Sequence, residues 1–180
     1  VGKPGGAIAL EITLTEATFE VDEPCLAAVV GPAEYVRING QDHPLHQTLK
    51  LVAGDRLHIG PSRPACRTYL AISREIEAER LLGGGSTYLP ASLGGFHGRA
   101  LADGDVVRFL PGTPVADPDR TTPPALRPHF SDDHVLRVTP GPEANQTVAC
   151  ILQDLCSTSY AVGARANRMG MALEGAPLSE

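Results

Sequence analysis

Aromatic residues are scarce in this sequence, and tryptophan and long apolar runs are absent. The 180 residues include 4 Tyr, 4 Phe and no Trp, whereas proteins that bind single-stranded nucleic acids stack the bases on aromatic rings. The formal net charge of -6 repels a phosphate backbone. No apolar segment approaches the roughly 18 residues that a membrane-spanning helix needs. We therefore expect neither nucleic acid nor a membrane as a partner.

The cysteines match no metal-binding or redox motif. Cys25, Cys66, Cys150 and Cys156 form no Cys-x-x-Cys pair, and no Cys/His spacing matches a zinc site. The last two lie on one predicted helix and are separated by about 9 Å along its axis, which is too far for a disulfide. Free thiols are typical of a reducing compartment, so we expect a cytoplasmic protein.

Motifs for self-contained catalysis and for metal binding are also lacking. There is no Gly-x-Ser-x-Gly elbow and no Walker-type lysine loop, which disfavours an independent hydrolase or ATP-binding domain. His43 and His46 lie on either side of Pro44 without a third ligand at a useful spacing, so we predict no metal site. The chain does not begin with Met and starts with no signal peptide. We interpret it as a fragment of a longer protein.

The first 72 residues predict a series of short β-strands. Val, Ile and Leu recur there in short runs bounded by Gly, Pro or Asp, the pattern of half-buried strands. Asn39-Gly40 separates two extended segments and is a strong signal for a tight hairpin. The predicted strands cover residues 8–15, 18–21, 26–30, 35–38, 48–52, 56–59 and 66–72.

A local pattern recurs fifty residues along the chain. The segment LVAGDRL at 51–57 is echoed by LADGDVV at 101–107. In both, a Gly-Asp turn precedes a predicted strand, because Gly accepts positive φ and Asp caps its own turn. The echo predicts two similar corners of one barrel or sandwich. Between them, residues 74–82 are rich in Glu, Ala and Arg and favour a short helix.

Composition divides the chain into three parts. Six prolines lie within 111–133, a composition typical of an extended surface linker. We therefore predict one β-barrel unit over 1–110, a linker over 111–133, and the beginning of a second unit over 134–180. In that second unit we expect a strand at 135–138 and a helix with Asn145 as its N-cap. The apolar face of this helix would consist of Val148, Ile151, Leu152 and Leu155.

Several motifs in order resemble one known family. They are LEITL at 10–14, RTYLAI at 67–72, GSTYL at 85–89, LGGFHGRAL at 93–101 with Gly-Asp at 104–105, and NRMG at 167–170 with LEGAPL at 173–178. Together they resemble the C-type subunit of bacterial 5-oxoprolinase, a family also called KipA-like or biotin-dependent carboxyltransferase. Its older name is allophanate hydrolase subunit 2, and it is related to urea amidolyase. The likeness spans essentially the whole chain.

The resemblance implies a fold and a set of partners. It implies a mostly-β, cyclophilin-like barrel, with two related barrel units in the complete protein. It also implies a B-type (KipI-like) partner and an A-type subunit, which together open 5-oxoproline to glutamate with ATP. ATP would therefore enter through the complex. This ATP-dependent amidohydrolase is the preferred function.

Two alternatives stay open. In the first, the chain is the carboxyltransferase component of a urea carboxylase or urea amidolyase, which receives a carboxyl group from biotin carried by a partner. In the second, the chain is a non-catalytic antagonist that binds a KipI-like kinase inhibitor.

The chain departs from the family pattern at two places. Arg74-Glu75 stands where family members have Gly-Gly, and Gly84-Gly85 where they have Ser-Arg. The loss of a loop arginine removes a permanently charged group with five donors. This member has therefore lost activity or changed its specificity. The family's N-terminal segment and the Gln-Thr-Thr-Gly-Gly stretch after the second signature are absent as well.

Carried onto this chain, the signatures give candidate catalytic residues. Both reactions develop negative charge on a carbonyl or carboxylate oxygen, which requires preorganised donors. Arg99 and Arg168 are the candidate cationic donors, and Asn167 is an orienting amide. Ser86 and Thr87 would place hydroxyl and backbone N–H groups around an anion. The competing interpretation is that the glycines only form a tight turn and that the arginines form surface ion pairs.

Four further residues are candidates for catalysis or substrate binding. Glu11 interrupts an apolar strand and would act as a general base if burial raised its pKa, although a solvent-facing carboxylate is commoner. Gly94 and Gly95 are assigned to substrate binding. His97, in the same signature, would shuttle a proton. The mechanism requires the two arginine-bearing signatures to converge on one cluster of anionic oxygens.

Overall fold

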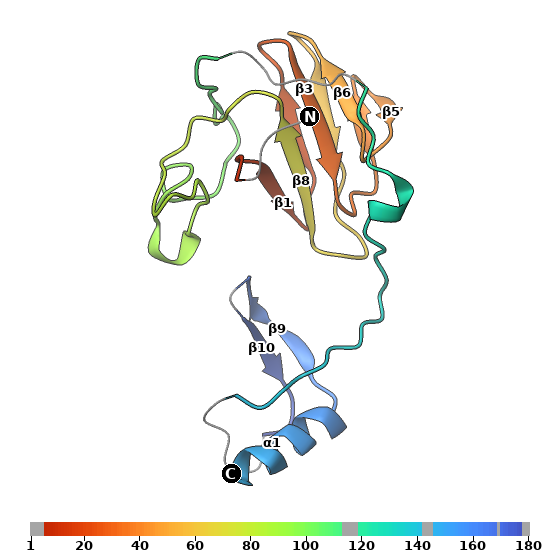
Figure 1. The fold of residues 1–180 in the computed structure, drawn as a ribbon, viewed down its shortest axis with the longest axis vertical. Helices are drawn as coiled ribbons and strands as arrows, with labels where there is room; N and C mark the ends of the chain where they lie inside the picture. The colour runs from red at the N-terminus through yellow and green to blue at the C-terminus, as the bar shows by residue number, and fades with distance from the viewer. Residues whose placement is uncertain (1–5, 113–118, 142–145, 169, 178–180) are drawn as a thin grey trace. The chain divides into compact units, whose positions relative to one another are not determined.

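The chain is mostly β and divides into two compact units. The computed structural model describes residues 6–112, 119–141, 146–168 and 170–177. The first unit comprises Val1–Asp133 and the second His134–Glu180, and Figure 1 shows the strands of each. Within the described part, no helix has the length and apolar character to span a membrane.

Two four-stranded antiparallel sheets make up the core of the first unit. One has the order β1-β8-β3-β6 and the other β2-β7-β4-β5. The mostly-β class is confirmed, and the described strands of the first unit form two sheets that do not close into a barrel. The strands are β1 Leu10–Thr13, β2 Ala17–Glu20, β3 Cys25–Val30, β4 Val36–Ile38, β5 Gln41–His43, β6 Thr48–Leu51, β7 Arg56–Ile59 and β8 Arg67–Ile72.

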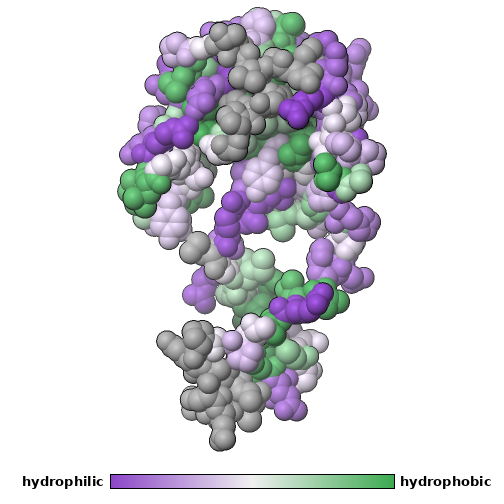
Figure 2. Space-filling view, viewed as in Figure 1, coloured by the Kyte–Doolittle hydropathy of each residue, from purple (hydrophilic) through white to green (hydrophobic). Residues whose placement is uncertain are grey.

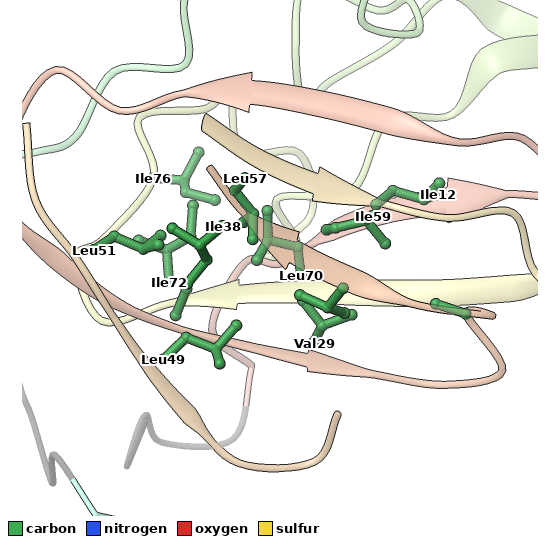
Figure 3. Packing of buried hydrophobic residues seen from close by; sticks show 13 residues of the cluster. Ile12, Val29, Ile38, Leu49, Leu51, Leu57, Ile59, Leu70, Ile72 and Ile76 are labelled. Carbon is green, nitrogen blue, oxygen red and sulfur yellow. The ribbon is translucent and has the colours of Figure 1, made fainter. Parts of the chain in front are cut away.

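The period-two pattern of the sequence explains which side chains form the core. In β8 buried residues alternate with half-buried ones along the whole strand, as expected where one face of a sheet is covered. Figure 3 shows side chains of both sheets meeting in one cluster, for example Val29 and Leu70 from the first and Leu57 and Ile59 from the second. All strands predicted in the first 72 residues are present, within three residues at their ends.

The Asn39-Gly40 hairpin is confirmed. Asn39 has φ 52° and Gly40 has φ 83°, the left-handed pair that a type I′ turn requires. The Asn39 side chain also accepts a hydrogen bond from the Arg56 N–H (2.9 Å) and donates one to Asp55 (2.7 Å). The turn between β4 and β5 is thereby joined to the start of β7.

The segment predicted as a helix at 74–82 is extended, so that prediction is wrong. Ile76 is 4% exposed and pairs with Phe109 in an antiparallel bridge. The Glu77 N–H donates to the carbonyl of Arg108 (2.8 Å). Non-local pairing and burial of Ile76 outweigh a weak helix propensity spread over nine residues.

Part of the predicted linker packs against the first unit. Thr121 forms a bridge with Gln47. The Thr48 N–H donates to Arg120 and the Thr122 N–H donates to His46, both at 2.8 Å. Residues 119–122 therefore lie along the edge of β6, and a short 3₁₀ turn, η2 Pro124–Leu126, follows. The boundary drawn at residue 110 stays a prediction.

The second unit contains helix α1 Gln146–Ser157 and the antiparallel pair β9 Ala161–Ala166 and β10 Met171–Glu174. The helix is present where it was predicted, and Ile151, Leu152 and Leu155 are half-buried. Its expected N-cap Asn145 lies outside the described residues, and the side chain of Val148 is not described either. The strand predicted at 135–138 is wrong, since these residues pair with no strand in the described part of the chain.

Candidate functional site

The glycine-rich signature folds into a tightly constrained loop beside the sheets of the first unit. Tyr88 and Leu93 exchange backbone hydrogen bonds of 2.8 and 3.2 Å around a 3₁₀ turn, η1 Leu89–Ala91. Glu79 and Gly95 exchange another pair at 2.9 and 2.8 Å. The loop is therefore closed twice by its own backbone. On the face drawn in Figure 2, hydrophobic residues reach the surface at this edge of the first unit.

Glycine is required inside this loop for two reasons. Gly94 and Gly95 have φ values of 64° and 58°, in the left-handed region that favours glycine. A Cβ atom on Gly95 would also collide with the hydroxyl and the backbone of Thr87. Both glycines, assigned to substrate binding from the sequence, are buried. Their geometry shows at least a structural role.

The two predicted hydroxyl groups lie in different surroundings. Thr87 is half-buried, and its Oγ1 accepts a hydrogen bond from the Phe96 N–H (3.1 Å). The N–H of Gly95 already binds the carbonyl of Glu79. Both backbone N–H groups are thus used inside the loop, whereas Ser86 is exposed to solvent. A binding role for Ser86 or Thr87 stays a prediction.

Arg99 is held by the carboxylate of Asp105. Its two terminal nitrogens donate to the two Asp105 oxygens at 2.6 and 2.8 Å, the bidentate geometry that suits a guanidinium. The guanidinium also lies 5.1 Å from the centre of the Phe96 ring. Hydrogen bonds from Arg99 and from the Ala102 N–H lower the pKa of Asp105 from 3.8 to about 2. Arg99 therefore already has an anionic partner, as the competing interpretation of this arginine expected.

The repeated Gly-Asp pattern forms the same turn twice. The Val52 N–H donates to Asp55 (2.8 Å), and the Ala102 N–H donates to Asp105 (2.7 Å). In the first turn the second carboxylate oxygen accepts from Asn39, and in the second it accepts from Arg99. The turn recurs as expected, because in both copies an aspartate caps a backbone N–H three residues earlier. Only the first turn is followed by the expected strand, β7, whereas after the second, Phe109 forms an isolated bridge with Ile76.

A groove of about 440 Å³ lies beside this loop. One wall is the extended segment at 77–79, and the others are the loop at 95–97 and the chain after the second Gly-Asp turn. The lining residues are Glu77, Ala78, Glu79, Gly95, Phe96, His97, Val106 and Arg108. It therefore brings two carboxylates, one guanidinium and one imidazole to a single depression.

The remaining candidates of the first unit lie in two places. Glu11 is on the outward-facing side of β1 and accepts from Arg67 Nε on the neighbouring β8 (3.1 Å). This is the commoner case of a solvent-facing carboxylate. His97 is exposed and lines the groove, with its ring centre 4.7 Å from that of Phe96. Of the catalytic and binding candidates, Gly95 and His97 line the groove.

Asn167 and Arg168 belong to the second unit. The Asn167 N–H donates to the carbonyl of Gly170 (2.9 Å), and the Asn167 side chain accepts from the Gly170 N–H (3.2 Å). These bonds close the turn between β9 and β10. Because Arg99 and Arg168 lie in different units, their convergence on one site stays a prediction.

The three carboxylate and guanidinium residues of the groove were not predicted from the sequence. Composition assigns Glu77 and Glu79 to a helix, and Arg108 belongs to no motif. The signal that identifies them is non-local, namely the pairing of Ile76 with Phe109. In the part of the chain that the structure describes, no group of three or more His, Cys, Asp or Glu residues is arranged to hold a metal ion.

Comparison with known proteins identifies the family. The model described as carboxyltransferase domain, subdomain A and B, matches residues 1–180. Urea amidolyase of Saccharomyces cerevisiae is 30% identical over 97% of this chain, and the C-type subunit of Escherichia coli 5-oxoprolinase is 28% identical, also over 97%. The chain spans 10% of the yeast protein and 55% of the bacterial one.

The solved structures agree. The urea carboxylase of Kluyveromyces lactis superposes with a TM-score of 0.83 at 27% identity, over 99% of this chain and 17% of that protein. The resemblance to the C-type 5-oxoprolinase family that the motifs indicated is thus confirmed. The chain belongs to the family of carboxyltransferase domains, subdomains A and B.

Proposed function

We propose that this chain is part of an enzyme subunit that acts, together with partner subunits, on a small amide, with the ATP-dependent opening of 5-oxoproline as the first candidate reaction. The observation that carries the proposal is the groove, which joins carboxylates, a guanidinium and an imidazole next to the glycine-rich signature. The relative named as a 5-oxoprolinase subunit supports the reaction, and its name supports a multi-subunit enzyme.

The groove supplies side-chain donors for amide chemistry. Attack on an amide carbonyl places negative charge on its oxygen, and a fixed donor at that oxygen stabilises the transition state. The N–H groups of Gly95 and Phe96 are engaged within the loop. We propose a side chain as the donor, and Arg108 and His97 line the groove. A carboxylate there would accept a proton or orient water.

We propose that ATP binds outside the groove. The polyphosphate carries several negative charges, and Glu77 and Glu79 line the same depression, so like charges would face each other. A second hollow, of about 170 Å³, is lined by both Asp119 and Arg120, and Asp119 forms an ion pair with Lys50 (3.7 Å). We therefore place the ATP site on a partner subunit.

Carboxyl transfer is the second candidate. It is favoured by the description of the family model and by the relatives named urea amidolyase and urea carboxylase. The ureido ring of carboxybiotin keeps one N–H group and one carbonyl, which match a glutamate and Arg108 of the groove in hydrogen-bonding character. Biotin on a partner's carrier domain would supply the carboxyl group.

Co-expression with a B-type and an A-type subunit tests the two reactions. If the first candidate holds, ADP release requires all the subunits and rises on addition of 5-oxoproline. Turnover that depends on a biotinylated carrier and a carboxyl acceptor such as urea would support the second candidate. Tight binding to a KipI-like protein without turnover under either condition would contradict both and support the antagonist instead.

A further inference from the structure

We propose that the groove binds the edge of a cis amide, in which an N–H and a C=O point the same way, with Arg108 donating to the oxygen and Glu77 or Glu79 accepting from the N–H. This rests on the groove of the proposed function and assigns its ligand-binding residues. Two sources share this chemistry, a lactam such as 5-oxoproline and a ureido group such as that of urea or biotin.

The extended segment at 77–79 forms one wall of the groove. The Glu77 N–H donates to the carbonyl of Arg108 (2.8 Å), and Ile76 pairs with Phe109. Ile76 is buried against the core. In an extended segment, side chains alternate between the two sides, so Glu77 and Glu79 share the side opposite Ile76. The core therefore fixes the backbone that presents both carboxylates.

These charges are unpaired: of the ion pairs in the described part of the chain, none includes Glu77, Glu79 or Arg108. Arg99, the donor predicted from sequence, by contrast forms a bidentate ion pair with Asp105. Among the described residues, the arginines with ion pairs include Arg37, Arg56, Arg63, Arg67, Arg74, Arg80 and Arg99. We therefore assign donation to the ligand oxygen to Arg108 instead of Arg99.

The charges of the groove determine which ligand matches it. Ionised carboxylates only accept hydrogen bonds, and a guanidinium only donates them. A ligand that satisfies both needs a donor and an acceptor on one edge. Ordinary secondary amides are trans and place N–H and C=O on opposite sides, whereas a five-membered lactam or cyclic urea holds them together. A ligand with only anionic oxygens would face Glu77 and Glu79 unfavourably.

Binding of neutral probes to the whole chain tests the proposal without turnover. The probes are 2-pyrrolidone, 2-imidazolidone and the trans amide N-methylacetamide, titrated while protein-observed NMR shifts are recorded. We expect the two cyclic probes to bind at least about tenfold more tightly than N-methylacetamide, the size of one charge-assisted hydrogen bond. The relative affinity of 2-pyrrolidone and 2-imidazolidone distinguishes a lactam site from a ureido site.

Variants of the groove complete the test. Arg108→Ala and Glu77→Gln/Glu79→Gln are each expected to weaken the cyclic probes about tenfold or more, whereas Arg120→Ala, in the second hollow, leaves them unchanged. Arg108→Lys keeps the charge without the planar fork and should give an intermediate affinity, which separates lost binding from lost folding. Equal affinity for N-methylacetamide, or full affinity in Arg108→Ala, would overturn the proposal.

The two levels of proposal fail differently. If the cyclic probes bind as expected and no mixture of the partner proteins turns over, the groove assignment stands and the proposed function is wrong. If turnover occurs and the Arg108→Ala variant supports it with unchanged kcat/KM, the function stands and the groove assignment is wrong.

Discussion

Asp105 shows how much a single carboxylate organises near the glycine-rich loop. It accepts two hydrogen bonds from Arg99 and one from the Ala102 N–H, which together lower its pKa to about 2. A depressed pKa contributes stability that is present above the ordinary value of 3.8 and is lost as the pH falls toward 2. We expect Asp105→Asn to melt at a lower temperature than the parent chain at pH 6, with the difference shrinking between about pH 4 and pH 2.

Thermal unfolding followed by circular dichroism across this pH range measures the effect. Asp103→Asn is the matched control, because the Asp103 side chain, two residues away, forms no hydrogen bond or ion pair in the described part of the chain. A difference between Asp105→Asn and the parent that stays constant down to pH 2 would show that the carboxylate charge contributes nothing.

Gly95 is the residue at which loop geometry is most restrictive. A methyl group there would meet the hydroxyl of Thr87 and would have to adopt φ 58°. The left-handed conformation and the overpacking together predict that Gly95→Ala destabilises the chain by about 2–4 kcal/mol. Urea unfolding measures the change. Gly84→Ala, whose nearest contact is an ordinary 3.6 Å, should change stability by less than about 1 kcal/mol, and equal effects of the two would contradict the argument.

Leu82 has an unfavourable backbone conformation in the hairpin at 81–84. Leu81 and Gly84 exchange two backbone hydrogen bonds of 2.9 Å, and Leu82 between them has φ 50° while fully exposed. Asparagine followed by glycine is the preferred pair for such a turn. We expect Leu82→Asn to stabilise the chain by about 0.5–1 kcal/mol, measured by urea unfolding. Leu126→Asn, at another exposed position, should be nearly neutral, and a destabilised Leu82→Asn would show that the leucine packs against something.

Elements with a strong local pattern were predictable, and those that depend on a distant partner were not. The alternation in β8 and the Asn39-Gly40 turn are local signals, and both elements are present. Residues 74–82 have the composition of a helix, but Ile76 finds a better environment against Phe109 and the core. Residues 135–138 have the composition of a strand, but a strand needs a hydrogen-bonding neighbour.

The same distinction applies to the candidate site. The glycine-rich signature was recognisable because its glycines satisfy a local backbone requirement. Whether an arginine is available to a ligand depends on which carboxylate lies nearby in space. Arg99 has Asp105, whereas Arg108 lines a groove with two glutamates and forms an ion pair with neither. Sequence identified the first arginine and structure the second.

At the scale of the whole molecule, the position of the boundary between the units has a measurable consequence. Composition placed the end of the first unit at residue 110, whereas compactness places it at Asp133. The segment between them is bonded along β6 through Arg120 and Thr122. A fragment of residues 1–133 should therefore be more stable than one of residues 1–110 by about 1–3 kcal/mol, the contribution of two backbone hydrogen bonds.

Urea unfolding of the two fragments tests this, and 1–133 with Thr122→Pro is the control. Proline at 122 removes the N–H that donates to His46 while leaving the length unchanged, so this variant should lose part of the difference. A fragment of residues 1–110 as stable as 1–133 would mean that residues 119–122 add nothing to the first unit. The proline-rich segment would then be a linker along its whole length, and the boundary at residue 110 would hold.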